Sequence, residues 1–454
     1  MFPSYRETRW VKFKRAHYET PTLTYSARIT KVTRFPLSDI PPELNQAKLS
    51  DAVSALRIKE FRRFWFAGLA SNSGGLLQGI ASPFIMYEMT ESGAWVGGSV
   101  FALMLPMAIV GPFAGPMADR LSRRKILLIC EVILATIAIS NAILWWSGIR
   151  EPLIYVGVNI IYGVANGYAL PSWQAYVADL VPRDYLMNAI TLNSTQFNAA
   201  RAIGPSIGGV VLASAGAGWA FFGNGLSFVV VFVTLLTLPK TPSSPLAGRK
   251  DSQLSQFKKG WEYAKTQPTI MTGYFAAACV AVLGGPLVQV HLILFVENVF
   301  QVSEFKFGLL MSTYGIGAVM IAPWLAAYGS RIKRSRLLVG SLAIYGIGEL
   351  LLTATKIYWI GVSGIFIVGC AHLVMATTTN TTLQLHVPEP VRGRIMAMYL
   401  MVFTIGAPLG SIIQGPLADK FGPRSVVTVM GICFLAATLL FVVSGRASSY
   451  DFDE

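Results

Sequence analysis

Apolar stretches of about 20 residues recur along this chain, and they constrain its fold more than any other feature. A run of that length, coiled as a helix, crosses the hydrocarbon core of a bilayer with its backbone groups hydrogen-bonded internally. Only 13% of the residues are charged, whereas a soluble domain carries roughly a quarter charged residues. We therefore expect an all-α membrane protein with twelve spans, at 64–87, 98–117, 126–147, 152–178, 187–213, 219–238, 270–295, 306–327, 337–353, 357–383, 395–417 and 425–444.

Lysine and arginine residues predict the orientation of these spans. With the N-terminus inside, the inner segments carry 31 of the 37 basic residues, and the outer loops carry five. Cytoplasmic loops of membrane proteins carry such an excess. We therefore expect a multi-pass protein of the cell's inner or plasma membrane, with both termini in the cytoplasm. The net charge of +14 follows from this bias. A nucleic-acid-binding surface would not distribute its charge loop by loop, so we expect no nucleic-acid partner.

Polar segments divide the chain further. We expect a mobile cytoplasmic tail at the N-terminus, two six-helix bundles joined by a basic cytoplasmic linker, and a short C-terminal tail, bounded as 1–53, 54–239, 240–268, 269–445 and 446–454. The four cysteines lie inside predicted spans, where cysteine acts as a small apolar residue.

Enzyme chemistry is not indicated. The chain has no G-x-x-x-x-G-K-[S/T] phosphate-binding loop, no metal-ligand cluster and no nucleophile–base pair. We therefore expect no enzyme activity, no metal and no cofactor.

The second bundle repeats the first. At an offset of 206 residues, GVAN (163–166) aligns with GCAH (369–372), and Gly204, Gly209 and Gly216 align with Gly410, Gly415 and Gly422. Earlier in each half, at an offset of 211, RLSRRKIL (120–127) aligns with RIKRSRLL (331–338). Because glycines let lipid-embedded helices approach closely, shared glycine spacing predicts shared helix packing.

Two similar segments, GPMADRLSRRK (115–125) and GPLADKFGPR (415–424), occupy different positions in this repeat. The first follows the second span on the predicted inner side. The second follows the eleventh span on the predicted outer side, and the repeat aligns it with VVLASAGAGW (210–219). We therefore interpret only the first as a functional motif.

The first segment resembles the loop motif G-x-x-x-D-R-x-G-R-R of the major facilitator superfamily, with Ser122 in place of the second glycine. Other segments resemble the enterobactin-exporter and macrolide-efflux branch of that superfamily, namely EFRRFWFAG, NAARAIGPSIGG, VPEPVRGRIMAMY and PLGSIIQGPLADKFG. The resemblance covers residues 55–445 and implies the superfamily fold of two six-helix bundles.

The resemblance also implies that this loop clamps the two bundles on the cytoplasmic side. Asp119 can face the N-terminal end of the eleventh helix, where free N–H groups favour an anion, and the arginines can reach Asp179. Orientation bias alone is the alternative, although it does not explain a glycine and an aspartate at fixed spacing. The expected gating residues are Gly115, Asp119, Arg120, Arg123, Arg124 and Asp179.

The fifth span contains a second short motif. Gly204, Pro205, Gly208 and Gly209 resemble part of a motif associated with antiporters, in which proline and glycines bend the helix and pack it tightly. The match favours export. A packing kink without transport meaning is the alternative.

Ionisable and amide side chains inside spans are costly and mark candidate functional sites. Glu131 or Glu349 could take up a proton because burial disfavours the charged carboxylate, and Arg201 could be its counter-ion or bind an anionic substrate. Polar residues that merely join helices are the alternative. The candidates for a central cavity are Arg201, Glu131, Glu349, Asn166, His372, Asn72, Gln78, Asn193, Gln196 and Asn198.

We therefore predict a secondary active transporter, a monomer in the lipid bilayer that exports a small amphipathic molecule such as a drug or siderophore in exchange for protons. An importer of the same fold, a receptor without transport and an integral membrane enzyme are the alternatives.

Overall fold

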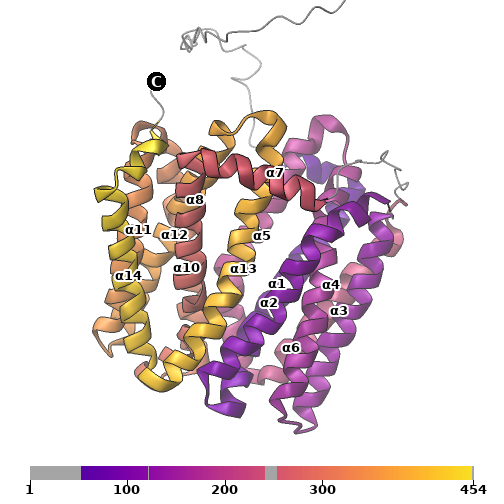
Figure 1. Ribbon diagram of the computed structural model, residues 1–454. Coiled ribbons are helices and arrows are strands. Elements are labelled where there is room, and N and C mark those ends of the chain that lie inside the picture. The colour runs from indigo at the N-terminus through magenta and orange to yellow at the C-terminus, as the bar shows by residue number, and fades with distance from the viewer. Residues whose placement is uncertain (1–52, 121, 241–252, 452–454) are drawn as a thin grey trace, which may run out of the picture. The chain divides into compact units, whose positions relative to one another are not determined.

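The computed structural model of the 454-residue chain describes residues 53–120, 122–240 and 253–451, and every regular element in those ranges is a helix (Figure 1). The predicted N-terminal tail therefore lies outside the described residues, apart from Val53. The fold class confirms the all-α prediction, and each predicted span coincides with a long helical segment.

Six long helices form the N-terminal bundle. Short turns join them: Glu91, in the left-handed region, ends the first helix, and Pro152 occupies the first turn of the fourth. The helices are α1 (Lys59–Thr90), α2 (Gly93–Arg120), α3 (Arg123–Trp146), α4 (Pro152–Asp179), α5 (Arg183–Ala215) and α6 (Ala217–Thr237).

The C-terminal bundle begins with an irregular helix. Helix α8 (Pro268–Cys279) continues without a break through π-helical turns and the short α9 (Leu292–Phe295) to Phe300. The remaining helices are regular, namely α10 (Glu304–Tyr328), α11 (Arg334–Ala354), α12 (Tyr358–His386), α13 (Glu389–Phe421) and α14 (Pro423–Val443).

Among the described residues, ten helical segments are long and apolar enough to cross a membrane; α1 is not in that set, and within α5 only the shorter apolar segment Gly204–Ala215 is found. Both carry amides in their middle turns, with Asn72 and Gln78 on α1 and Asn193 and Gln196 on α5. These polar residues face cavities or neighbouring helices: Asn72 and Asn193 line a cavity, Gln78 bonds to Asn224 and Gln196 bonds to Trp65.

Two segments are more ordered than the sequence indicated. The predicted linker contains the helix α7 (Gln253–Thr266), which lies across one end of the bundle helices with Ala264 fully buried (Figure 1). The predicted C-terminal tail forms a 3₁₀ turn over Arg446–Tyr450, and Asp451 accepts hydrogen bonds from the backbone N–H and hydroxyl of Ser335. We call the end of the helices at which α6 ends and α7 lies the linker end, and the opposite end the far end.

The glycine repeat is visible in the backbone. Gly216, between α5 and α6, and Gly422, between α13 and α14, have φ angles of +84° and +81°. A methyl group on Gly163 would strike the carbonyl oxygen of Leu103. A methyl group on Gly369 would strike that of Tyr314, the residue equivalent to Leu103 at the offset of 211. The two bundles thus share turn geometry and helix packing.

The bundles touch each other at the far end through two helix pairs, α2 with α13 and α5 with α10. In the first pair, Gly97 lies against the carbonyl oxygen of Ser411. In the second, Gly308 lies against the Cα of Gly209. Small residues at both contacts allow the backbones to meet directly, which closes the far end.

Candidate functional site

A cavity of about 400 Å³ lies within the N-terminal bundle, and we call it the linker-side cavity. It opens outward, because Gln174, Ser194 and Phe197 in its wall are exposed. Five helices contribute to its wall, through Gly68, Ser71, Asn72, Glu131, Leu134, Asn166, Ala169, Leu170, Trp173, Gln174, Asn193, Ser194, Phe197 and Phe228.

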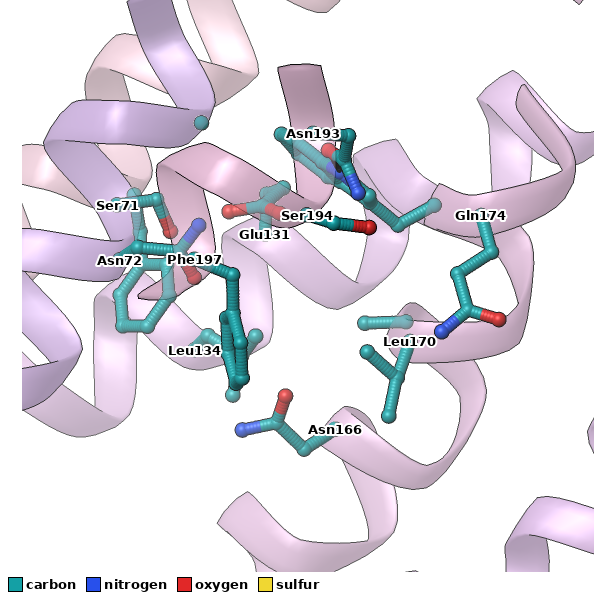
Figure 2. Close-up of a pocket in the computed structure, with 14 residues that line it drawn as sticks. Ser71, Asn72, Glu131, Leu134, Asn166, Leu170, Gln174, Asn193, Ser194 and Phe197 are labelled. Carbon is teal, nitrogen blue, oxygen red and sulfur yellow. Dashed lines mark hydrogen bonds between the residues drawn. The ribbon is translucent and has the colours of Figure 1, made fainter. Parts of the chain in front are cut away.

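Four of the residues predicted from sequence line this one cavity. Asn72 from α1 and Glu131 from α3 lie on one side, Asn166 from α4 lies at its base in the view, and Asn193 comes from α5 (Figure 2). Amide groups can donate and accept hydrogen bonds, and the carboxyl group adds a site for a proton or a cation. The wall therefore suits a ligand with several polar groups.

Glu131 is the chemically distinctive residue of the cavity. It begins the third turn of α3 and is only 3% exposed, and its Oε2 has no hydrogen-bond partner among the described residues. A buried carboxylate without a partner is unfavourable, whereas a protonated carboxyl or one paired with a ligand cation is not. The group is therefore suited to exchange a proton for a ligand.

Sequence reasoning missed the aromatic part of the wall. The Trp173 ring stacks on Phe64 with a centroid distance of 3.9 Å, and its Nε1 donates to Asn193 Oδ1 at 3.2 Å. The stacking contact and the hydrogen bond hold the indole in place beside the exposed ring of Phe197. The signal available in the sequence was the spacing of Asn166, Leu170 and Trp173 on one face of the fourth span.

Other candidates lie elsewhere. Gln196 donates to the carbonyl oxygen of Trp65 at 3.0 Å and joins α5 to α1. Glu349 is fully buried in α11, and neither of its carboxyl oxygens has a partner among the described residues. His372 lies among the rings of Tyr314, Tyr345 and Phe403 in the C-terminal bundle. Gln78 lines a separate cavity of about 250 Å³, to which both bundles contribute.

The loop motif is described only in part, because the side chains of Gly115, Asp119 and Arg120 lie outside the described residues. Arg123 forms an ion pair with Asp179 at 2.6 Å, and it also donates to the carbonyl oxygen of Ala175 at 3.2 Å. These bonds join the start of α3 to the end of α4 within one bundle.

Arg124 has a different partner from Arg123. It donates to the carbonyl oxygens of Leu235 and Leu236, at 2.6 and 2.9 Å, in the last turn of α6. A cation at the C-terminal end of a helix is stabilised by its free carbonyl groups. Arg123 and Arg124 therefore fix the linker ends of three helices relative to one another.

The glycine motif of α5 makes close contacts on two sides. Methyl groups on Gly204 and Gly208 would meet Leu76 and Ile80 of α1, whereas Gly209 faces α10 of the other bundle. The motif thus packs α5 against both neighbours. The side chains of Asn198 and Arg201, on the same helix, lie outside the described residues.

The segment that sequence analysis set aside makes a contact between the bundles. Asp419, near the end of α13, accepts hydrogen bonds from the backbone N–H groups of Gly93 and Ala94, at 2.5 and 3.0 Å, and from the hydroxyl of Ser92 at 2.6 Å. Its carboxylate therefore caps the N-terminus of α2 across the bundle interface. The sequence signal was present, since the GPLAD segment copies GPMAD, but its partner helix lies more than 300 residues away.

No group of three or more His, Cys, Asp or Glu side chains that could hold a metal ion occurs within the described ranges.

Sequence comparison identifies the family. The family described as transmembrane secretion effector, within the major facilitator superfamily, matches residues 50–449. An enterobactin exporter of Citrobacter koseri is 24% identical over 396 residues, which cover 84% of this chain and 91% of that protein. A multidrug resistance protein of Proteus mirabilis is 23% identical, with 83% of this chain and 92% of the relative covered. An uncharacterized MFS-type transporter of Bacillus subtilis is 24% identical over 76% of this chain and 83% of its own length.

Solved structures show the same fold at lower identity. A mutant of the nucleoside transporter NupG superposes with a TM-score of 0.71 at 15% identity, and covers 85% of this chain and 99% of that one. A bacterial homologue of the human lysosomal transporter Spinster, in an inward-facing and unoccupied conformation, gives 0.65 at 16% identity, with 89% of this chain and 97% of that one covered. The chain therefore belongs to the transmembrane secretion effector family of the major facilitator superfamily, and it is a multi-pass membrane transporter.

Proposed function

We propose that the protein exports a small amphipathic molecule from the cytoplasm in exchange for protons, as a monomer in the cell membrane with both termini inside. The linker-side cavity carries this proposal. Amides and a carboxyl group line one part of it and aromatic rings another, so it suits a ligand with polar and apolar portions. The relatives named as an enterobactin exporter and a multidrug resistance protein support the direction of transport.

The closed far end supports alternating access. The bundles meet there through glycine contacts, and the exposed cavity residues Gln174, Ser194 and Phe197 lie nearer the linker end. The excess of lysine and arginine in the loops at the linker end supports a cytoplasmic position for that end. A ligand would enter from the cytoplasm in this state, and the bundles would then rock to close the linker end and open the far end.

Two carboxylates would hold the two closed states. At the linker end, Asp119 would cap the N-terminus of α13 when that end closes, with Arg123 and Asp179 fixing the loop around it. At the far end, Asp419 caps the N-terminus of α2 in the present state. In each case the end of one helix of the α2–α13 pair would supply an anion to the start of the other.

Proton coupling would run through Glu131. The carboxyl group faces the cavity, so a proton from the outside and a ligand from the inside would use the same group in turn. Glu349 is equally buried but lines none of the cavities described for this chain, so it provides a matched control.

The test is efflux of ethidium, a cationic probe, and chloramphenicol, a neutral amide probe, from proteoliposomes with and without an imposed proton gradient. We expect gradient-driven movement of at least one probe, lost in Glu131→Gln and retained in Glu349→Gln. Movement that ignores the gradient would contradict proton coupling. Accumulation against the expected direction would indicate an importer, and binding without flux would indicate a receptor.

The role of Asp119 needs its own variant. In the same assay, Asp119→Asn should slow turnover without reducing insertion, because the amide keeps the shape of the side chain and removes the charge that would cap α13. Unchanged turnover would contradict the gate.

A further inference from the structure

A cavity of about 420 Å³ lies at the linker end of the C-terminal bundle, and we call it the α8–α14 cavity. Its wall is formed by the last turn of α7, by α8, by the last turns of α14 and by the C-terminal 3₁₀ turn. None of the described residues that line it belongs to the N-terminal bundle. The cavity is therefore separate from the linker-side cavity and from the contacts at which the two bundles meet.

The α8–α14 cavity opens toward lipid. In its wall, Phe275 of α8 is 45% exposed and Leu440 of α14 is 54% exposed. The exposed apolar surface of α14 continues beside the cavity at Leu439, Val442 and Val443. Both helices belong to segments that are long and apolar enough to span a membrane, so exposed apolar side chains on them face acyl chains rather than water.

The wall changes from charged to apolar along the helices. Lys265 and Arg446 lie at the linker end, beside the first residue of α8, and Phe275 lies two turns further along α8, about 10 Å deeper. Helix α14 runs in the opposite direction, so Leu440 lies deeper than Ser444. A phospholipid has the same order of groups, with a charged phosphate at the membrane surface and acyl chains beneath it.

The two basic residues of the wall have no carboxylate partner in the described part of the chain. Neither Lys265 nor Arg446 forms an ion pair there, and no carboxylate among the described residues lines the cavity. The Lys265 Nζ lies 5.3 Å from the centre of the Trp261 ring, and that ring is itself exposed. Tryptophan is enriched at the headgroup level of membranes, and unneutralised basic groups at that level attract anionic lipids.

Ordered backbone holds both cations beside α8. Ala264, which precedes Lys265, is fully buried, so the last turn of α7 is packed against the bundle. The turn that begins with Arg446 contacts α8, and the hydroxyl of Thr269 donates to the carbonyl oxygen of Ser449 at 2.8 Å. The segments that the sequence indicated as a linker and a tail therefore present one basic residue each to the same cavity.

We propose that the α8–α14 cavity binds an anionic phospholipid of the leaflet at the linker end. Its phosphate lies between Lys265 and Arg446, and an acyl chain lies over Phe275 and Leu440. The two basic residues alone would also suit a free phosphate, whereas the apolar part of the wall favours the lipid. The site does not depend on the substrate, direction or proton coupling proposed above, and the proposed orientation makes this leaflet the cytoplasmic one.

The first experiment removes the charge at the cavity. Native mass spectrometry of the purified protein compares binding of phosphatidylglycerol, which is anionic, with that of phosphatidylcholine carrying the same acyl chains. The test variant is Lys265→Gln with Arg446→Gln. The control, Lys258→Gln with Lys333→Gln, removes the same charge at exposed positions of the linker end outside the cavity.

We expect the wild type and the control to bind phosphatidylglycerol at least about fivefold more tightly than phosphatidylcholine, and the test variant to lose this preference. Equal preference in the two double variants would mean that the basic residues of the linker end attract lipid without a defined site. Absence of any preference in the wild type would equally overturn the proposal.

The second experiment fills the apolar part of the cavity and leaves the charges in place. Leu440→Trp puts a large side chain into the wall, and Leu439→Trp, at an exposed neighbouring position outside it, is the control. We expect weaker phosphatidylglycerol binding in Leu440→Trp only, and no displacement of the lipid from the wild type by millimolar inorganic phosphate. Equal lipid binding in the two variants, or displacement by phosphate, would overturn the assignment to a lipid, and displacement would identify a site for free phosphate.

Discussion

The two contacts that close the far end are equivalent by the internal repeat, yet they differ in chemistry. Gly97 of α2 and Gly308 of α10 occupy matching positions, and each meets the backbone of the other bundle, at Ser411 and Gly209. Among the described residues, only the α2–α13 contact has a carboxylate that caps the partner helix, that of Asp419. The two copies therefore share the backbone packing and differ in the carboxylate that caps α2.

The repeat shows why the α5–α10 contact has no such clamp. The residue equivalent to Asp419 is Ala213, and the residue equivalent to Gly93 is Glu304. In place of a charged cap, this contact has a hydrogen bond between the hydroxyls of Ser206 and Ser312 at 2.8 Å. We infer that the α2–α13 contact latches the closed far end and that the α5–α10 contact, which has no charged cap, holds it more weakly.

The largest effect is expected when a large side chain replaces a glycine at a contact between the bundles. In Gly97→Leu the new side chain meets the carbonyl of Ser411, a backbone atom that cannot rotate away, and overpacking of this kind costs about 1–3 kcal/mol. Pulsed EPR distances between spin labels on the far ends of the two bundles should show the far end shifted toward the open state, and transport should fall more than tenfold. Gly98→Leu, whose neighbour space is empty, is the control. An unchanged distance distribution in Gly97→Leu would mean that the contact does not hold the far end closed.

A smaller effect is expected from weakening the contact of Asp419 with the N-terminus of α2. Asp419→Asn keeps the shape of the side chain but removes the charge that strengthens its bonds to Gly93, Ala94 and Ser92, so the closed far end should lose about 1–2 kcal/mol. The same EPR distances measure that shift as a population change of about five- to thirtyfold. Asp451→Asn, which weakens a contact inside the C-terminal bundle only, should leave the distances unchanged. Equal shifts in both variants would remove the special role of Asp419.

Sequence patterns predicted the helices well because a lipid environment requires each span to be long and apolar, and this pattern can be read within the span itself. Apolar length placed each span within a few residues of a helix, and glycine spacing indicated the packing later visible at Gly163 and Gly369. Helix α7 was missed because its 14 residues are amphipathic rather than apolar, so a search for spans passes over them.

The site was harder to predict, because cavity residues are selected by contacts between helices. Polarity inside a span identified Asn72 and Glu131, which do line the linker-side cavity, and equally Gln196 and Glu349, which do not. The pairing of Asp419 with α2 depends on how the two bundles meet, and no pattern within either segment encodes that. Aromatic Trp173 resembles any apolar residue of a span until its neighbours are known.

The α5–α10 contact should tolerate more change than the Asp419 contact of α2 with α13. Ser312→Ala removes one neutral hydrogen bond to Ser206, and a bond of that kind contributes about 0.5–1.5 kcal/mol. Because Gly308 and Gly209 still hold the helices together, we expect a shift in the EPR distances smaller than that of Asp419→Asn and transport within about threefold of wild type. Ser341→Ala, which loses only a bond within α11, is the control. A shift as large as that of Asp419→Asn would make the two contacts equal partners.

The smallest expected effect comes from introducing a carboxylate at the α5–α10 contact, which lacks one that caps the partner helix. It is also the most selective test of the comparison between the two contacts. Gly209 lies beside the carbonyl of Glu304 as Gly415 lies beside that of Gly93, so a carboxylate one turn further along, at position 213, should reach the N-terminus of α10. In Ala213→Asp alone, the side chain of Glu304 would repel the new charge. In Ala213→Asp with Glu304→Gly, the new carboxylate should cap α10 and stabilise the closed far end by about 0.3–1 kcal/mol. The EPR distances should therefore shift toward the closed state in the double variant only, and turnover should slow because both contacts would then have to open. If the double variant opens the far end instead, the equivalence of the two contacts does not extend to their helix termini, and the asymmetry would lie in the backbone rather than in two side chains.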